Sequence, residues 1–242
     1  YNIRSMAISP DGRFALVGTQ ALTVPDEHGK GELFLWDLAT GEIARRFENT
    51  ADVTKIDFNA AGDRALTSSA WGKHITLWDV TTGQPITRID HDILNAVAFS
   101  PDETAALGAS EDGRLLLWDL ATGEMVRLYI GHDAVLYEVL IHQGNRTVVS
   151  NSPGAGSFIL WDFDTAQELR RFGGPRFGGW PMNIAFHPNG NVLTSSEVGD
   201  IIEWRGTEWT LVELLDWIDE NRYIREFTCE EREQYRIEPL CE

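Results

Sequence analysis

The chain has 242 residues, of which 43% are hydrophobic, and its 38 acidic against 20 basic residues give a formal net charge of −18. This length suits one large domain, and no apolar run approaches the roughly 18 residues that a membrane-spanning helix needs. The negative field repels nucleic-acid phosphates and anionic lipids, which argues against nucleic acid and membranes as partners. A basic protein surface, or no charged partner at all, fits better.

A tryptophan recurs every 40–43 residues along the chain, at Trp36, Trp78, Trp118, Trp161 and, in a weaker copy, Trp204. Each of the first four is followed by an aspartate and closes an apolar, β-rich run such as Leu-Leu-Leu-Trp-Asp. A fixed period in this range indicates a repeat array. Such arrays usually act by presenting a surface and seldom by housing a catalytic group.

The repeat from His91 to Tyr129 is typical of four short strands joined by turns. Its turn and hairpin signals are Pro101-Asp102, Asp112-Gly113 and Thr122-Gly123. Short apolar or alternating segments lie beside these signals, and they predict strands at Asn95–Ser100, Ala105–Ser110, Leu115–Asp119 and Glu124–Tyr129. A unit of four strands joined by short turns is a propeller blade.

From about residue 3 to residue 206 the chain resembles WD40-repeat β-propellers. The resemblance rests on four Trp-Asp pairs, three of them followed by x-x-Thr-Gly at the next turn, and on turns such as Ser9-Pro10-Asp11-Gly12. It implies an all-β fold of four-stranded antiparallel blades over residues 1–207, with about five blades. A short helical tail over residues 208–242 is expected to pack on the propeller.

Many blades of this family contain a buried network of His, Asp, Ser or Thr, and Trp. The third repeat matches it best, and the resemblance implies a structural network of His91, Ser110, Asp112 and Trp118. A buried indole N–H needs an acceptor, which a connected polar chain supplies. Other repeats carry Lys30, Gly72 or Ala155 where the aspartate should be. We therefore expect blades of unequal stability, with the third the most stable.

Five repeats are fewer than the seven that are usual in the family. An open array leaves strand edges and apolar faces uncovered. Because the first residue is Tyr1 and not a methionine, we expect that two further blades precede it in the native protein, or that a partner chain completes the ring.

Three loops depart from the minimal repeat, at residues 19–32, 151–157 and 173–181, and function concentrates in loops on a rigid scaffold. Arginine and aromatic residues are enriched at binding hot spots. We therefore predict a partner-binding face that includes Trp71, Arg176, Phe177 and Trp180. In the alternative interpretation, Phe177 and Trp180 pack under the edge of a blade.

The tail changes to a helical period, with Leu211, Leu214, Leu215 and Ile218 on one face. Its segment Arg222–Cys241 resembles the tail of bacterial WD40 proteins, although Phe227 replaces the usual leucine. Many such proteins are multidomain signalling ATPases, kinases or protease-like effectors. Cys229 and Cys241 are the two cysteines, which favours a reducing, cytoplasmic location. A bridge between them would instead suit an extracellular structural propeller.

The sequence carries no phosphate-binding Gly-x-x-x-x-Gly-Lys loop, no His-Glu-x-x-His or Cys-x-x-Cys metal motif and no Gly-x-Ser-x-Gly elbow. We therefore expect no catalytic residue, no cofactor and no metal site in this chain. The predicted function is a bacterial protein-interaction scaffold or sensor that binds a protein partner. The alternative is the C-terminal regulatory propeller of a multidomain signalling enzyme, an ATPase, kinase or protease-like protein, whose catalytic domain lies outside this chain.

Overall fold

The computed structural model describes residues 2–20, 30–48, 51–92, 94–142, 144, 146–173, 181–187, 191–196 and 201–204. The chain divides into two compact units, Tyr1–Arg205 and Gly206–Glu242. All of the described residues belong to the first unit. The second unit, with the expected helical tail, Cys229 and Cys241, lies outside the described residues.

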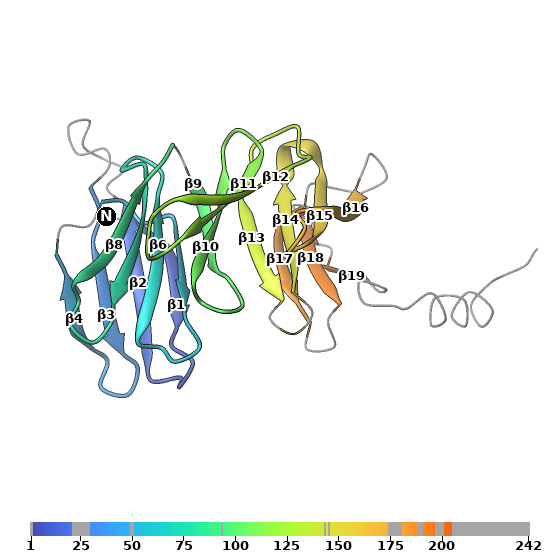
Figure 1. Cartoon of the computed structure of the whole chain (residues 1–242). Helices are drawn as coiled ribbons and strands as arrows, with labels where there is room; N and C mark the ends of the chain where they lie inside the picture. The colour runs from blue at the N-terminus through green and yellow to red at the C-terminus, as the bar shows by residue number, and fades with distance from the viewer. Residues whose placement is uncertain are drawn as a thin grey trace, which may run out of the picture. The chain divides into compact units, whose positions relative to one another are not determined.

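Five antiparallel sheets follow one another along the chain, and each is called a blade (Figure 1). Blade 1 contains β1 (Asn2–Ile8), β2 (Phe14–Gln20), β3 (Leu33–Asp37) and β4 (Glu42–Phe47), and blade 2 contains β5 (Lys55–Phe58), β6 (Arg64–Ser69), β7 (His74–Asp79) and β8 (Pro85–Asp90). Blade 3 contains β9 (Leu94–Phe99), β10 (Ala105–Ser110), β11 (Arg114–Asp119) and β12 (Met125–Ile130). Each is ordered as in the sequence, which confirms the predicted blade.

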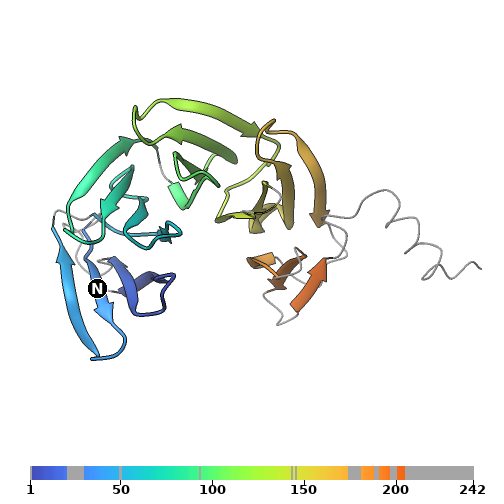
Figure 2. The ribbon, with the colours of Figure 1, turned by 60° about the horizontal axis from the view of Figure 1, so that its bottom comes forward.

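Blade 4 contains β13 (Glu138–His142), β14 (Thr147–Ser152), β15 (Ser157–Asp162) and β16 (Glu168–Gly173), with a short 3-10 turn, Pro153–Ala155, between β14 and β15. Blade 5 has three strands in the described part of the chain, β17 (Pro181–Phe186), β18 (Val192–Ser196) and β19 (Ile201–Trp204). The first strand of each blade is its inner strand, and the inner strands of consecutive blades contact one another. Figure 2 shows the blades side by side in a propeller arrangement.

The Trp-Asp-x-x-Thr-Gly pattern recurs because it builds the turn after the third strand. In blade 3, the Asp119 carboxylate accepts the main-chain N–H of Thr122 at 2.8 Å and that of Ala121 at 2.9 Å. These bonds hold the pKa of Asp119 below its usual value. Gly123 follows with a φ of +74°, a conformation that glycine adopts without steric cost. The aspartate after the tryptophan is therefore a turn residue.

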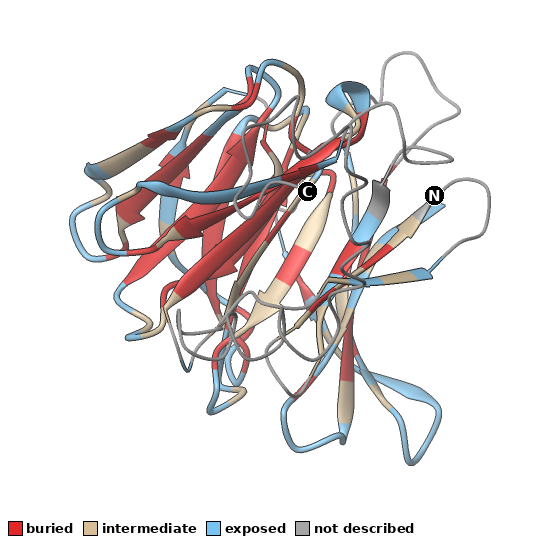
Figure 3. Ribbon diagram, turned by 90° about the vertical axis from the view of Figure 1, so that its right-hand side faces the viewer, coloured by how far each residue is buried: buried red, intermediate tan, exposed pale blue. Residues whose placement is uncertain are grey.

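Each blade from the second onward packs its tryptophan against the outer strand of the blade before it. The ring centroids of Phe47 and Trp78 lie 5.5 Å apart, and those of Tyr129 and Trp161 lie 5.9 Å apart. In blade 5, the ring centroid of Trp204 lies 5.1 Å from that of Phe172 and 5.0 Å from that of Phe158. These junctions supply most of the core. Figure 3 shows that buried residues lie mainly in the strands, whereas exposed residues lie in the turns and along the outer strands.

Among the described residues, no other blade covers the equivalent face of blade 1. Trp36 is 36% exposed, whereas Trp78, Trp118 and Trp161 are at most 4% exposed. Met6 and Ile8 on β1 are exposed beside it. The tryptophan face of blade 1 is therefore partly exposed, whereas the corresponding apolar faces of the following blades are buried at the junctions between blades.

Candidate functional site

The inner strands of all five blades converge on a polar cavity of about 340 Å³. We call it the central mouth, and its principal lining residues are Arg4, Lys55, Asn95, Tyr137, Glu138 and Asn183. The register places it at one end of the blades, because Asn2 pairs with Gln20 and Lys55 pairs with Ser68. The turns between the second and third strands lie at that same end.

The predicted binding residue Trp71 belongs to this end, because it lies in the turn between β6 and β7. Its side chain is 57% exposed. Its main-chain N–H donates to the buried Asp52 carboxylate at 3.2 Å, and Ser69 Oγ donates to that carboxylate at 2.5 Å. The turn that carries Trp71 is therefore held by a buried acceptor. Arg176, Phe177 and Trp180 lie outside the described residues, so the four-residue binding face stays a prediction.

Two β-bulges shape the central mouth. In β1, Ile3 pairs with Thr19 and Ser5 with Gly18, which leaves Arg4 as an extra residue. In β9, Asn95 is the extra residue between Leu94 and Ala96. A bulge re-aims a side chain away from the regular alternation of a strand. Both extra residues line the mouth.

An ion pair crosses the mouth from blade 2 to blade 4. Lys55 Nζ lies 2.6 Å from Glu138 Oε1, and both side chains are partly buried. The other carboxylate oxygen of Glu138 accepts the main-chain N–H of Ile184, on the inner strand of blade 5, at 2.9 Å. Both oxygens of Glu138 are therefore engaged, and one acidic side chain joins three blades.

An exposed aromatic residue stands beside this pair. Tyr137 is 57% exposed and lines the mouth next to Glu138. Sequence reasoning missed Arg4, Lys55, Tyr137 and Glu138 because it searched the loops. The available signal was the phase of the repeat. At least one of the two residues that lie three and four places before Ile8, Phe58, Phe99, Ile141 and Phe186 is polar, and its identity differs from blade to blade.

The tryptophan network follows a fixed register. In each blade, the tryptophan of the third strand pairs with a residue of the second strand, and the acceptor position lies two residues after that partner. In three blades a hydroxyl at this position accepts the indole N–H: Trp78 donates to Thr67 at 2.9 Å, Trp161 to Ser150 at 2.9 Å and Trp204 to Thr194 at 2.8 Å. In blade 3 that place is Gly108, because Ala106 pairs with Trp118. A Cβ atom on Gly108 would lie 2.8 Å from the Trp118 ring.

The predicted network of blade 3 is therefore arranged differently from these three. His91 meets the Trp118 ring edge-on, with ring centroids 5.0 Å apart. Asp112 bonds to Arg114, which is the main cause of its lowered pKa, and Ser110 contributes to the same shift. Ser110 lies two residues beyond the acceptor position. That His91, Ser110, Asp112 and Trp118 act as one network, and that blade 3 is the most stable, stay predictions.

Blade 4 contains a connected chain of polar groups. Ser150 Oγ accepts the Trp161 indole N–H and is hydrogen-bonded to His132 Nε2 at 2.8 Å. Burial, together with the nearby positive charge of Arg171, lowers the pKa of His132 to about 4. His132 Nδ1 has no partner among the described residues, in agreement with the alanine, Ala155, at the expected aspartate position.

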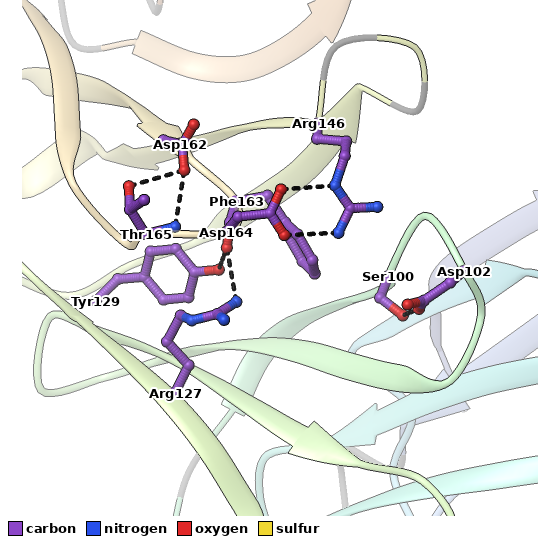
Figure 4. A network of polar contacts seen from close by, with 9 residues as sticks. All are labelled: Ser100, Asp102, Arg127, Tyr129, Arg146, Asp162, Phe163, Asp164 and Thr165. Atoms are coloured by element: carbon purple, nitrogen blue, oxygen red, sulfur yellow. Dashed lines mark hydrogen bonds and ion pairs between the residues drawn. The ribbon is translucent and has the colours of Figure 1, made fainter.

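A second polar network fastens blade 3 to blade 4 and does not line the mouth (Figure 4). The Phe163 carbonyl accepts the Tyr129 hydroxyl at 2.7 Å and Arg127 at 2.8 Å. Arg146 binds the Asp164 carboxylate through two hydrogen bonds of 2.7 and 2.8 Å. Arg127 and Arg146 are both engaged in contacts with the Phe163–Asp164 segment, so this network explains packing.

The model of the family described as "WD domain, G-beta repeat" matches residues 83–119. Autophagy-related protein 16 of Arabidopsis thaliana is 25% identical over 218 residues, covering 88% of this chain and 41% of the relative. Pre-mRNA-processing factor 17 of Homo sapiens is 29% identical over 154 residues, covering 62% and 26%. A guanine nucleotide-binding protein subunit beta of Zea mays is 29% identical over 122 residues, covering 44% and 32%.

The chain thus spans between a quarter and about two fifths of the length of these relatives. All three come from eukaryotes, so the bacterial origin implied by the tail stays a prediction. Within the described residues, no helical segment has the length and hydropathy that crossing a bilayer requires.

Proposed function

We propose that this WD40-repeat β-propeller is a protein-interaction scaffold or sensor module, and that it binds its protein partner at the end that carries the central mouth. One observation carries the proposal: two exposed aromatic side chains, Trp71 and Tyr137, lie at the same end as a polar cavity built by all five inner strands. Exposed aromatic residues on a rigid scaffold are the typical anchors of protein interfaces.

We propose further that the chain itself has no catalytic activity. The buried groups with strongly shifted pKa values serve structural contacts: Asp57 accepts the main-chain N–H of Phe99, and His132 is bonded to Ser150. A cytoplasmic location and the absence of nucleic-acid, membrane and cofactor binding belong to the same proposal.

A second candidate function is that of a regulatory propeller within a longer signalling enzyme, with the partner in the same polypeptide. This candidate is favoured because the chain covers only 41% and 26% of the length of two relatives, so similar segments occur in longer proteins. The intact mass of the protein from its native source separates the two candidates. A mass near 27.2 kDa supports a separate scaffold, and a much larger mass supports the regulatory propeller.

Site-specific photo-cross-linking tests the binding face. A photoreactive residue at Trp71 or at Tyr137, in the full-length protein in its native cells, should give the same cross-linked partner. The control position is Thr122, an exposed residue in the turn at the opposite end of blade 3. Equal cross-linking from Thr122, or none from either aromatic position, would contradict the proposal.

A further inference from the structure

We propose that the central mouth binds a carboxylate, namely an acidic side chain of the protein partner, through Arg4 and Lys55. This inference rests on the proposed function, because it names the chemistry by which the same end recognises its partner. It depends on three features: the position of Arg4, the unused donors of Lys55 and the charge balance of the cavity.

Arg4 is displayed at the mouth by the bulge in β1, and its residue is exposed. In the part of the chain that the structure describes, no carboxylate forms an ion pair with it. A guanidinium group presents five N–H donors in a planar fork that matches a carboxylate. Arg4 can therefore bind an incoming carboxylate without giving up an ion pair with any of the described residues.

Lys55 has donors left after its ion pair. An ammonium group has three N–H donors, and the contact with Glu138 Oε1 uses one of them. Glu138 itself is fixed by Lys55 and by the Ile184 main-chain N–H. Glu138 therefore holds Lys55 in place beside the cavity. No other described residue accepts a hydrogen bond from the ammonium group, so its other donors can reach a ligand.

The charge balance of the mouth is opposite to that of the chain. Among the described residues that line the mouth, Arg4 and Lys55 are two positive groups against one negative group, Glu138, in a chain of net charge −18. A cavity with low-dielectric walls concentrates the field of the charges that line it. A volume of about 340 Å³ accommodates an acidic side chain with its water. Asn95 and Asn183 add polar atoms around it.

The test is an NMR titration of the isotope-labelled full chain with N-acetyl-L-glutamic acid α-amide, which carries one carboxylate. The uncharged N-acetyl-L-glutamine amide and the cationic N-acetyl-L-lysine amide are the comparison probes. We expect saturable shifts of the Ser5 and Ile184 amides with the carboxylate probe alone. Added salt should weaken the binding, because charge pairs at an open cavity are screened.

The variants are Arg4→Gln and, as a matched control, Arg13→Gln, which removes the same charge from an exposed position at the opposite end of blade 1. Arg4→Gln should weaken binding of the carboxylate probe by about tenfold, in line with the loss of a charge-assisted contact. Arg13→Gln should leave it unchanged. Because Arg4 is exposed, the thermal midpoint of the variant should match that of the unmodified chain.

Equal shifts with the glutamine probe, preference for the lysine probe, or full binding by Arg4→Gln would each overturn the inference. Its failure is separable from failure of the proposed function. If partner cross-linking at Tyr137 persists while the carboxylate probe does not bind, the scaffold function stands and the carboxylate site falls. If the carboxylate probe binds and partner cross-linking is absent, the carboxylate site stands and the proposed scaffold function falls.

Discussion

The carboxylate of Asp57 accepts the main-chain N–H of Phe99 at 2.7 Å and so joins the inner strands of blades 2 and 3. Glu138 does the same for blades 4 and 5 through Ile184. Burial raises the pKa of Asp57 to about 6 against the lowering effects of the Phe99 N–H and of Lys55. An acidic group at a buried junction makes blade cohesion dependent on pH.

The first prediction concerns this dependence. Because the folded-state pKa of Asp57 is raised, the folded state holds the proton more tightly, and stability is gained as pH falls through about 6. Between pH 7.5 and pH 5, the free energy of unfolding of the unmodified chain should rise by about 1–2 kcal/mol relative to Asp57→Asn. Urea midpoints of both proteins at the two pH values measure this. Parallel pH curves would contradict it.

The second prediction has the opposite sign. His132 is neutral in the folded chain because its pKa is lowered to about 4, so its contribution to stability is lost as pH falls from about 6.5 towards 4. A direct NMR titration of the His132 ring should give a midpoint close to 4. A midpoint above 6 would mean that the ring is not buried as described.

The third prediction tests the polar chain of blade 4. Ser150→Ala removes the partner of the buried Trp161 indole N–H and of His132 Nε2 and should cost about 1–3 kcal/mol of unfolding free energy. Ser157→Ala is the matched control, because it is the same change in the same blade at a buried hydroxyl that has no partner among the described residues. That control should be close to neutral. Equal losses in the two variants would refute the assignment.

The fourth prediction concerns the space beside Trp118. Gly108→Ala places a methyl group 2.8 Å from the indole ring and should destabilise the chain by about 1–3 kcal/mol through overpacking. Gly154→Ala serves as a control for space, since its nearest neighbour, the Cβ of Ala134, would lie 3.7 Å away. Thermal unfolding of the two variants decides the matter, and an unaffected Gly108→Ala would show that the ring moves freely.

Much of the fold can be predicted from the sequence because each turn is specified by residues that are close together in the sequence. Asp119, Thr122 and Gly123 specify their turn by hydrogen bonds and a positive φ, and the same pattern recurs at the period of the blades. The register and the apolar runs then place the tryptophans in the core. Strand assignments in the third repeat therefore agree closely with the structure.

The site could not be predicted in the same way, because it consists of residues at which the repeats differ. Arg4 and Asn95 line the mouth because each lies in a β-bulge, and no local sequence pattern predicts these bulges. Lys55 and Glu138 are 83 residues apart and meet across the centre of the propeller. The need for glycine at position 108 is likewise seen only in the structure, where a Cβ atom would lie 2.8 Å from the Trp118 ring. Hot-spot composition alone predicts Trp71, which the structure places at the same end as the mouth, and its role in binding stays a prediction.

The packing of each tryptophan after Trp36 against the outer strand of the preceding blade gives the array a direction. One face of every blade offers the tryptophan, and the other offers the strand end that covers it, as Phe47 covers Trp78 and Phe172 covers Trp204. A gene duplication of one whole repeat therefore produces a unit whose two faces already fit its neighbours. Such a fold can lengthen by copying, while the residues that line its centre differ from copy to copy.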